Sequence, residues 1–311
     1  MASQPAAPSS ATLAAFAGAV LIGGSNYIAV KFSNEELDPL WGAALRFTTA
    51  AVLLLVICAI GKYPLPRGRS AVGATIYGLL GFGLSYACVY YAVVGLGAGP
   101  TAVVLGAVPL ATLLLAIVHG QEVLTARGVV GGVLAVAGIA ILSLGSLQRD
   151  LEPSYVVAAL IAVVAIAESS VVIKGFPSAH PMSTNAVGMS VGALFLVIAS
   201  LLFGQTWALP SAPRTWAALA WLALVGSVGL FWLFLYVIGR WTASASVYAL
   251  TLMPVVAVLL GSLVADEPIT VELVAGCALV LVAVYIGAIG GTKSHKEVEA
   301  VPDAGALSAE R

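Results

Sequence analysis

The sequence predicts an all-α membrane protein in which ten transmembrane helices form two inverted five-helix repeats. Its composition, its ten long apolar segments and an internal repeat together predict this fold. Charged residues make up 9% of the 311 residues and apolar residues 61%, whereas an ordinary soluble domain has about 25% charged residues. So little charge cannot cover a water-soluble surface, which excludes a soluble enzyme, a nucleic-acid-binding protein and a disordered chain.

Ten segments are long and apolar enough to cross a bilayer, for which a helix needs roughly 20 residues. Charges and Gly, Pro or Ser turns place them at 11–31, 37–60, 70–92, 98–119, 125–145, 154–174, 181–203, 213–238, 242–265 and 270–290. These runs lack the alternating pattern of barrel strands, so helices are expected. The polar N-terminal residues predict no cleaved signal peptide, and residues 292–311 are expected to form a disordered cytoplasmic tail.

Lysine and arginine are distributed unequally between the two sides of these segments. If the N-terminus is cytoplasmic, the cytoplasmic side holds Lys62, Arg67, Arg69, Arg127, Lys174, Arg240, Lys293, Lys296 and Arg311. The opposite side then holds only Lys31, Arg149 and Arg214. Because short cytoplasmic loops carry an excess of positive charge, both termini are predicted to be cytoplasmic.

An internal repeat relates the fourth and ninth segments. Pro109 precedes Glu122 by thirteen residues, and Pro254 precedes Glu267 by the same distance, at an offset of 145 residues (254 minus 109). The same offset relates Leu79 to Leu224, Gly81 to Gly226, Tyr91 to Tyr236 and Gly131 to Gly276. Nearly the same offset relates Lys31 to Lys174 and Pro39 to Pro181. The chain therefore divides into residues 1–147, residues 148–291 and the tail.

Each half contains five predicted helices, so the second half enters the membrane upside-down relative to the first. Inverted repeats of this kind are typical of secondary transporters, which bind their substrate near the membrane midplane between the repeats. The alternative interpretation is an old duplication that is retained only for packing. The architecture favours a carrier.

The proline within a helix, the glutamate turn after it and the Gly-rich apolar helix that follows resemble the EamA repeat. Two such repeats in ten helices are similar to the drug/metabolite transporter superfamily, and most of all to its bacterial aromatic amino-acid exporters, over about residues 11–290. This resemblance implies a central cavity lined by helices 1–4 and 6–9, with helices 5 and 10 at the periphery. It also implies export of amino acids.

Two charged residues lie well inside predicted helices, where a charge is costly and marks a candidate functional site. Arg46 lies in the second segment and Glu168 in the sixth. They form a structural ion pair between helices, or they bind the carboxylate and the ammonium group of an amino acid. The sequence leaves both interpretations open.

Further substrate-binding candidates are polar or aromatic residues within the predicted helices: Asn26, Tyr86, Tyr90, Trp232 and Ser244. Aromatic walls with a few polar groups suit a broad-range binding cavity. Against this interpretation, membrane aromatics often anchor helices at the interface, and small hydroxyls often allow close helix packing.

Pro109 and Pro254 each remove a backbone hydrogen bond within a predicted helix and should kink it. Symmetric kinks in helices 4 and 9 suit hinges that open the cavity alternately to either side. Glu122 and Glu267 lie in loops, where they are expected to cap the following helices.

These observations favour a secondary transporter that exports small metabolites, amino acids first among them, across a bacterial inner membrane. No metal-ligand spacing, nucleotide-binding loop or paired catalytic residues are found, so no cofactor and no enzyme activity are expected. The expected partners are the substrate and the lipid bilayer, not nucleic acid, and a monomer is compatible with the sequence. The alternatives are another substrate class, a channel or an intramembrane enzyme, and the driving force is open between protons and facilitated diffusion.

The charge distribution predicts the topology of the chain. A cysteine introduced at Gly68 should be labelled by an impermeant maleimide only from the cytoplasm, and one at Gln148 only from outside, because the positively charged loops stay inside. Labelling of intact cells and inverted vesicles checks this. The opposite pattern would overturn the assignment.

Overall fold

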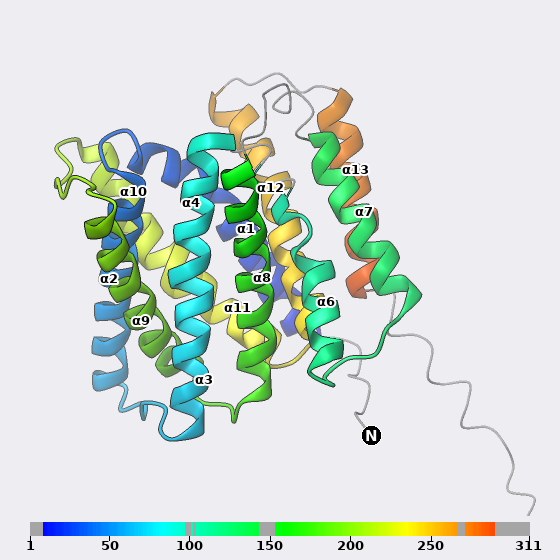
Figure 1. The fold of residues 1–311 in the computed structure, drawn as a ribbon, viewed down its shortest axis with the longest axis horizontal. Helices are drawn as coiled ribbons and strands as arrows, with labels where there is room; N and C mark the ends of the chain where they lie inside the picture. The colour runs from blue at the N-terminus through cyan, green and yellow to red at the C-terminus, as the bar shows by residue number, and fades with distance from the viewer. Residues whose placement is uncertain (1–8, 97–100, 102–103, 143–152, 266–270, 290–311) are drawn as a thin grey trace, which may run out of the picture.

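The computed structural model describes residues 9–96, 101, 104–142, 153–265 and 271–289, and these residues form helices and turns without a strand. The helices stand side by side in one bundle (Figure 1). An all-α fold is therefore confirmed. The tail predicted over residues 292–311 and the predicted loop residue Glu267 lie outside the described residues.

Every predicted segment contains helix. In the first half these are α1 (Ser10–Ser33), α2 (Pro39–Ile60), α3 (Arg69–Gly78), the π-helix η1 (Leu79–Leu84), α4 (Ser85–Leu96), α6 (Val108–Val118) and α7 (Ala126–Leu142). In the second half they are α8 (Pro153–Gly175), α9 (Pro181–Leu202), α10 (Pro213–Ala223), the π-helix η3 (Leu224–Gly229), α11 (Leu230–Ile238), α12 (Ala243–Ala265), α13 (Val271–Val284) and the π-helix η4 (Tyr285–Ile289).

Six helical stretches of the described chain are long and apolar enough to span a membrane. They are Ser10–Val30, Pro39–Ile60, Arg69–Ala92, Pro153–Gly175, Pro181–Leu202 and Pro213–Ile238. Proline stands in the first turn of α2, α6, α9 and α10, where its missing N–H has no intrahelical partner to lose. The count of ten spanning helices stays a prediction.

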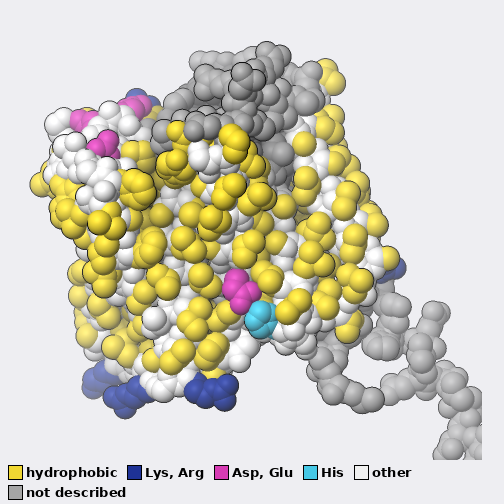
Figure 2. Space-filling model, in the orientation of Figure 1, with side chains coloured by type: hydrophobic (Ala, Val, Ile, Leu, Met, Phe, Trp, Pro, Cys, Tyr) yellow, Lys and Arg dark blue, Asp and Glu magenta, His cyan; other side chains and the backbone are white. Residues whose placement is uncertain are grey.

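The surface of the bundle fits a lipid environment. Hydrophobic side chains cover most of the visible face, and Lys and Arg gather at one end of it while acidic side chains gather at the other (Figure 2). Large apolar side chains such as Leu202, Val118 and Ile60 are about four-fifths exposed. A soluble protein rarely exposes so large an apolar surface to water, whereas lipid chains can cover it.

The two halves of the chain interlock. α1 packs against α11 and α12, α8 packs against α4 and α6, and α2 packs against α9. α7 and α13 pack on each other at one edge of the bundle, as expected for peripheral helices (Figure 1). Most major contacts therefore join a helix of one half to a helix of the other, and neither half has a separate core.

Two of the predicted helices contain a π-helical segment at equivalent places. η1 and η3 begin at Leu79 and Leu224, which differ by the repeat offset of 145 residues. A π-segment adds a residue to a helical turn, shifts the hydrogen-bonding pattern and is frequent at functional sites. Sequence reasoning matched these residues but treated both helices as regular.

Glycines in the π-segments permit close contact between the halves. A Cβ atom added at Gly226 would lie 2.1 Å from Oδ1 of Asn26, and one at Gly81 would lie 3.1 Å from Oγ of Ser169. Asn26 and Ser169 are separated by 143 residues, the offset that relates Lys31 to Lys174. The same contact between a π-segment and the first helix of the opposite half therefore occurs twice.

A carboxylate joins the halves at the end of the bundle where acidic residues gather. Glu36, between α1 and α2, accepts hydrogen bonds from the backbone N–H groups of Ser211 and Ala212, which precede α10. Hydrogen bonds from the side chains of Ser211 and Thr215 and from the backbone of Ala212 lower the pKa of Glu36 to about 2. Because the folded state depresses this pKa, the stabilisation is present above about pH 4.5 and is lost as the pH falls towards 2.

The close contact at Gly226 predicts a specific sensitivity to substitution. Gly226→Ala should destabilise the protein by about 1–3 kcal/mol, because the added methyl group has no space beside Asn26. Gly229→Ala, in the same π-segment, is the matched control. A Cβ atom added at Gly229 would lie no closer than 3.8 Å to another atom. Thermal unfolding in detergent measures both. Equal stability of the two variants would contradict the packing argument.

Candidate functional site

Arg46 lies buried in the middle of the bundle and is held by η3. Its side chain is 3% exposed. Its Nε donates to Oγ of Ser227 at 2.8 Å, and its Nη2 donates to the carbonyl oxygen of Gly226 at 2.7 Å. Arg46 comes from the first half of the chain and its partners come from the second, so the site is formed only when the halves pack together.

Asn26 of α1 approaches the same carbonyl from another side. Its Nδ2 donates to the Gly226 oxygen at 3.1 Å, while its Oδ1 is buried without a hydrogen-bond partner. An altered helical pattern leaves carbonyls that need other donors, and in lipid no water supplies them. Arg46 and Asn26, both predicted site residues, thus meet at one backbone oxygen.

The Arg46 guanidinium has no acidic partner among the described residues. The ion pairs of this part of the chain join His119 to Glu168 and Arg214 to Glu35. Two of the three guanidinium nitrogens, Nε and Nη2, form hydrogen bonds. The third, Nη1, forms none with the described residues. A buried cation without a carboxylate is costly, so the arrangement favours binding of an anion.

Aromatic rings surround the guanidinium. Its carbon atom lies 5.0 Å from the ring centroid of Phe47 and 5.6 Å from that of Tyr86, within the range of cation–π attraction. Tyr90 stands 6.3 Å from Tyr86 between centroids and lies close enough to Arg46 for an electrostatic interaction. The predicted residues Tyr86 and Tyr90 therefore belong to the same site.

Sequence reasoning missed two rings of this cluster. Phe82 of η1 and Phe231 of α11 pack edge to face with 4.6 Å between centroids, and both contact Phe47. Phe231 and Phe234 of α11 belong to the large apolar core of the described residues, and the predicted Trp232 does not. Trp232 is 36% exposed and packs beside Tyr236. A phenylalanine in an apolar helix has no distinctive sequence signal.

Glu168 lies apart from this cluster. Its Oε1 is 3.3 Å from Nε2 of His119, and its side chain is 25% exposed. It also lines a groove with Leu80 and Leu84 of η1 and with α8 residues of which Val157, Leu160, Ile161 and Val164 are strongly exposed. The ion pair between Glu168 and Arg46, one of the two interpretations that the sequence left open, is therefore not formed, because Glu168 points to the outer side of α8 while Arg46 turns inward. That both residues bind the substrate stays a prediction.

The remaining predicted residues divide between described and undescribed side chains. Pro109 is buried and is the second residue of α6, just after a turn at Gly106–Ala107 that interrupts the fourth predicted segment. Pro254 lies within the unbroken α12, and its side chain, like that of Ser244, is outside the described part. The helix is thus interrupted just before Pro109 and continuous through Pro254. The hinge role of both prolines stays a prediction.

The structure has the features of a multi-pass membrane transporter. Its helices are long and apolar, its two halves interlock, and a buried cation lies where the halves meet. The chain matches the EamA-like transporter family twice, over residues 10–144 and 153–288. It therefore belongs to that family, within the drug/metabolite transporter superfamily.

The curated relatives are transporters too. One from Archaeoglobus fulgidus, an uncharacterized transporter, is 29% identical and covers 85% of this chain and 93% of its own. The uncharacterized inner membrane transporter YedA of Escherichia coli K12 is 30% identical over 80% of this chain and 81% of its own. A crystal structure with 19% identity superposes with a TM-score of 0.75 over 90% of this chain and 96% of that chain, which shows a shared fold.

The two prolines predict a kinetic effect. Pro109→Ala should extend α6 backwards through Gly106–Ala107, and Pro254→Ala should straighten α12, which packs against α6. We expect each variant to slow transport several-fold more than it weakens substrate binding. Uptake rates and binding affinities in parallel measure this, with the exposed loop variant Pro64→Ala as control. Unchanged rates in both helix variants would exclude the hinges.

Proposed function

We propose that this protein is a secondary transporter of the bacterial inner membrane that exports small carboxylates, chiefly amino acids with apolar or aromatic side chains. The observation that carries the proposal is Arg46, a buried cation without a carboxylate partner among the described residues. Its guanidinium lies where the two halves meet, which is the usual place of the substrate in inverted-repeat carriers.

A substrate carboxylate would bind Nη1 of Arg46. Nε and Nη2 are already fixed by Ser227 and Gly226, so the guanidinium is held in one orientation before the substrate arrives. Such preorganisation lowers the entropy cost of binding. Charge-assisted hydrogen bonds to a guanidinium are also stronger than neutral ones.

Two features suit the rest of an amino acid. The buried Oδ1 of Asn26 is an acceptor without a partner, which an ammonium group would satisfy. The faces of Phe47 and Tyr86 form an apolar wall beside Arg46. Ring faces accept many side-chain shapes, so this wall suits a broad range of substrates better than fixed hydrogen bonds would.

Transport by alternating access follows from the contacts between the halves. Asn26, Arg46 and Gly226 come from α1, α2 and η3, so any rocking of one repeat against the other changes the surroundings of the bound carboxylate. The relative YedA is named an inner membrane transporter, which supports the proposed location. The outward direction rests on the resemblance to exporters.

The proposal predicts that transport depends on the carboxylate of the substrate and on Arg46. Arg46→Gln should reduce phenylalanine transport into proteoliposomes about tenfold to hundredfold, since a hydrogen bond to a charged group contributes about 1.5–3 kcal/mol. Arg46→Lys should retain part of it, and Arg214→Gln, a change of an exposed arginine, should have no effect.

Phenethylamine, which lacks the carboxylate, tests whether the protein recognises the carboxylate of its substrate. This separates carboxylate recognition from a loss of folding in the Arg46 variants. The wild-type protein should carry phenylalanine and not phenethylamine. Phenylalanine transport that survives in a folded Arg46→Gln variant would contradict the proposal. Transport of phenylpropionate as fast as phenylalanine would instead identify a carrier of carboxylates without an ammonium requirement.

A further inference from the structure

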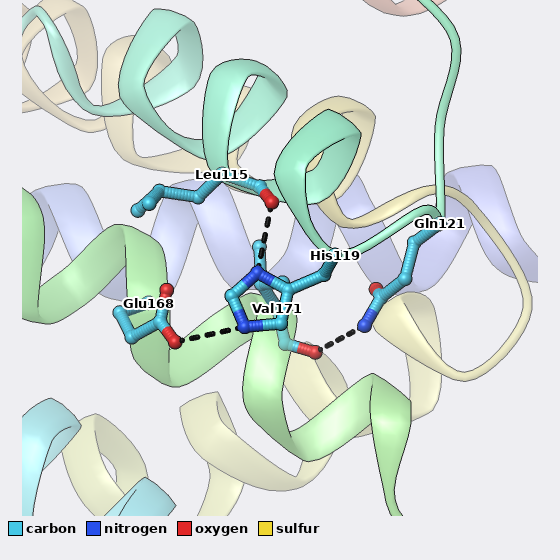
Figure 3. A network of polar contacts seen from close by, with 5 residues as sticks. All are labelled: Leu115, His119, Gln121, Glu168 and Val171. Carbon is cyan, nitrogen blue, oxygen red and sulfur yellow. Dashed lines mark hydrogen bonds and ion pairs between the residues drawn. The ribbon is translucent and has the colours of Figure 1, made fainter.

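His119 and Glu168 form a polar pair between the two halves of the chain, away from the proposed substrate site. His119 directly follows α6, and Glu168 lies in α8, two turns before that helix ends (Figure 3). Nε2 of the imidazole is 3.3 Å from Oε1 of the carboxyl group. Acidic and histidine side chains are seen together within the hydrophobic face in Figure 2.

The other imidazole nitrogen lies beside a backbone carbonyl group. Nδ1 of His119 is 2.9 Å from the carbonyl oxygen of Leu115 (Figure 3). A carbonyl oxygen only accepts hydrogen bonds, so Nδ1 carries a hydrogen. A neutral imidazole has one N–H group, which this contact uses.

The contact at Nε2 then requires one more proton. If Nε2 carries it, the pair is an imidazolium and a carboxylate; if the glutamate carries it, a carboxylic acid donates to the lone pair of a neutral imidazole. Without this proton, an imidazole lone pair would face a carboxylate oxygen at 3.3 Å, two acceptors in repulsion. In either form, the observed geometry holds one exchangeable proton.

We propose that His119 and Glu168 bind one proton and that its release separates α6 from α8, coupling transport to protons. The proton-binding site stands on the geometry of the pair, whereas the coupling to transport rests on the proposed function. Release of the proton leaves an uncompensated carboxylate in an apolar groove, which is a strong electrostatic reason for the two helices to move apart.

The Glu168 carboxyl group has few polar contacts within the part of the chain that the structure describes. Oε2 of Glu168 is buried without a hydrogen-bond partner, so an isolated carboxylate there would be poorly stabilised. Gln121, which follows His119, donates from Nε2 to the carbonyl oxygen of Val171 at 2.9 Å and forms a second link to α8 (Figure 3). His119, whose side chain is 39% exposed, is the more exposed member of the pair, and Glu168 is 25% exposed.

Other titratable groups on the neighbouring elements are mostly neutral. The elements packed against α6 and α8 are α3, η1, α4, α7 and α12. Their described titratable and charged residues are Arg69, Tyr77, Tyr86, Cys88, Tyr90, Tyr91, Arg127 and Tyr248. α8 itself adds Tyr155 and Lys174, whose ammonium group donates to the carbonyls of Ile238 and Trp241 and interacts electrostatically with Glu122.

The pair occurs once in the repeat. At the offsets that relate the halves, His119 corresponds to Val264 and Glu168 to Ser25, neither of which is ionisable near neutral pH. A single such pair in one half of the repeat makes the two open states of the carrier unequal. The proposal therefore gives one proton per transport cycle.

Proton binding is tested first without transport, by nuclear magnetic resonance of the purified, histidine-labelled full-length protein in lipid nanodiscs. The signal of His119, assigned by its loss in His119→Gln, should titrate between its proton-bound and proton-free forms. Glu168→Gln should change how this signal depends on pH, because it removes the carboxyl group that faces Nε2. A His119 signal that is unaffected by Glu168→Gln would overturn the proton site.

Coupling is tested in proteoliposomes that contain a pH-sensitive dye. A phenylalanine gradient should move protons through the wild-type protein, and Glu168→Gln and His119→Gln should each reduce this proton movement at least tenfold. His180→Asn, a change of a histidine that caps α9, should leave it intact. Phenylalanine transport without proton movement in the wild-type protein would overturn the coupling while the proposed function stands. Absence of phenylalanine transport would count against the proposed function, and the resonance titration would still decide the proton site.

Discussion

The carbonyl oxygen of Gly226 is the group on which the centre of this protein depends. Within a membrane, backbone oxygens that are displaced from regular helical bonding must find a donor inside the protein. Here the donors are Arg46 and Asn26, at 2.7 and 3.1 Å. This backbone atom thus joins α1, α2 and η3 and orients the buried cation. It also brings together the two halves of the chain.

The interlocked halves are similar in backbone and different in chemistry. Gly81 and Gly226 face Ser169 and Asn26 in equivalent contacts, so the repeat is visible in the packing. Arg46, however, corresponds to Gly188 at the offset that relates Pro39 to Pro181, and a Cβ at Gly78 would lie 2.2 Å from the Gly188 carbonyl oxygen. One interface is therefore closed by direct backbone contact, and the other contains a charge. In the proposed carrier, such asymmetric residues would make the inward-open and outward-open states differ in energy.

The side chains of Arg46 and Glu168, the two charged residues within predicted helices, point in different directions. Arg46 turns inward, to a carbonyl, a hydroxyl and aromatic rings. Glu168 turns to the outer side of α8 and meets His119 beside an apolar groove. If they formed one ion pair, each would neutralise the other and neither would be available to a ligand. In the proposals made above, this separation leaves the cation to bind a substrate anion and the carboxyl group to bind a proton.

The sequence by itself determined the class of fold, the positions of the helices and the relation between the halves, because apolar length and repeat spacing are local properties of the chain. It also indicated Asn26, Arg46, Tyr86 and Tyr90, since polar or aromatic residues inside apolar helices are rare enough to notice. Only the tertiary structure decided that Glu168 pairs with His119, that Phe82 and Phe231 complete the aromatic cluster, and that η1 and η3 are π-helical. These features depend on the rotation of each helix about its axis and on contacts between residues up to 200 positions apart, such as Asn26 with Gly226. In helices that are apolar on every side, no hydrophobic pattern fixes that rotation, so it is set by packing against the neighbouring helices.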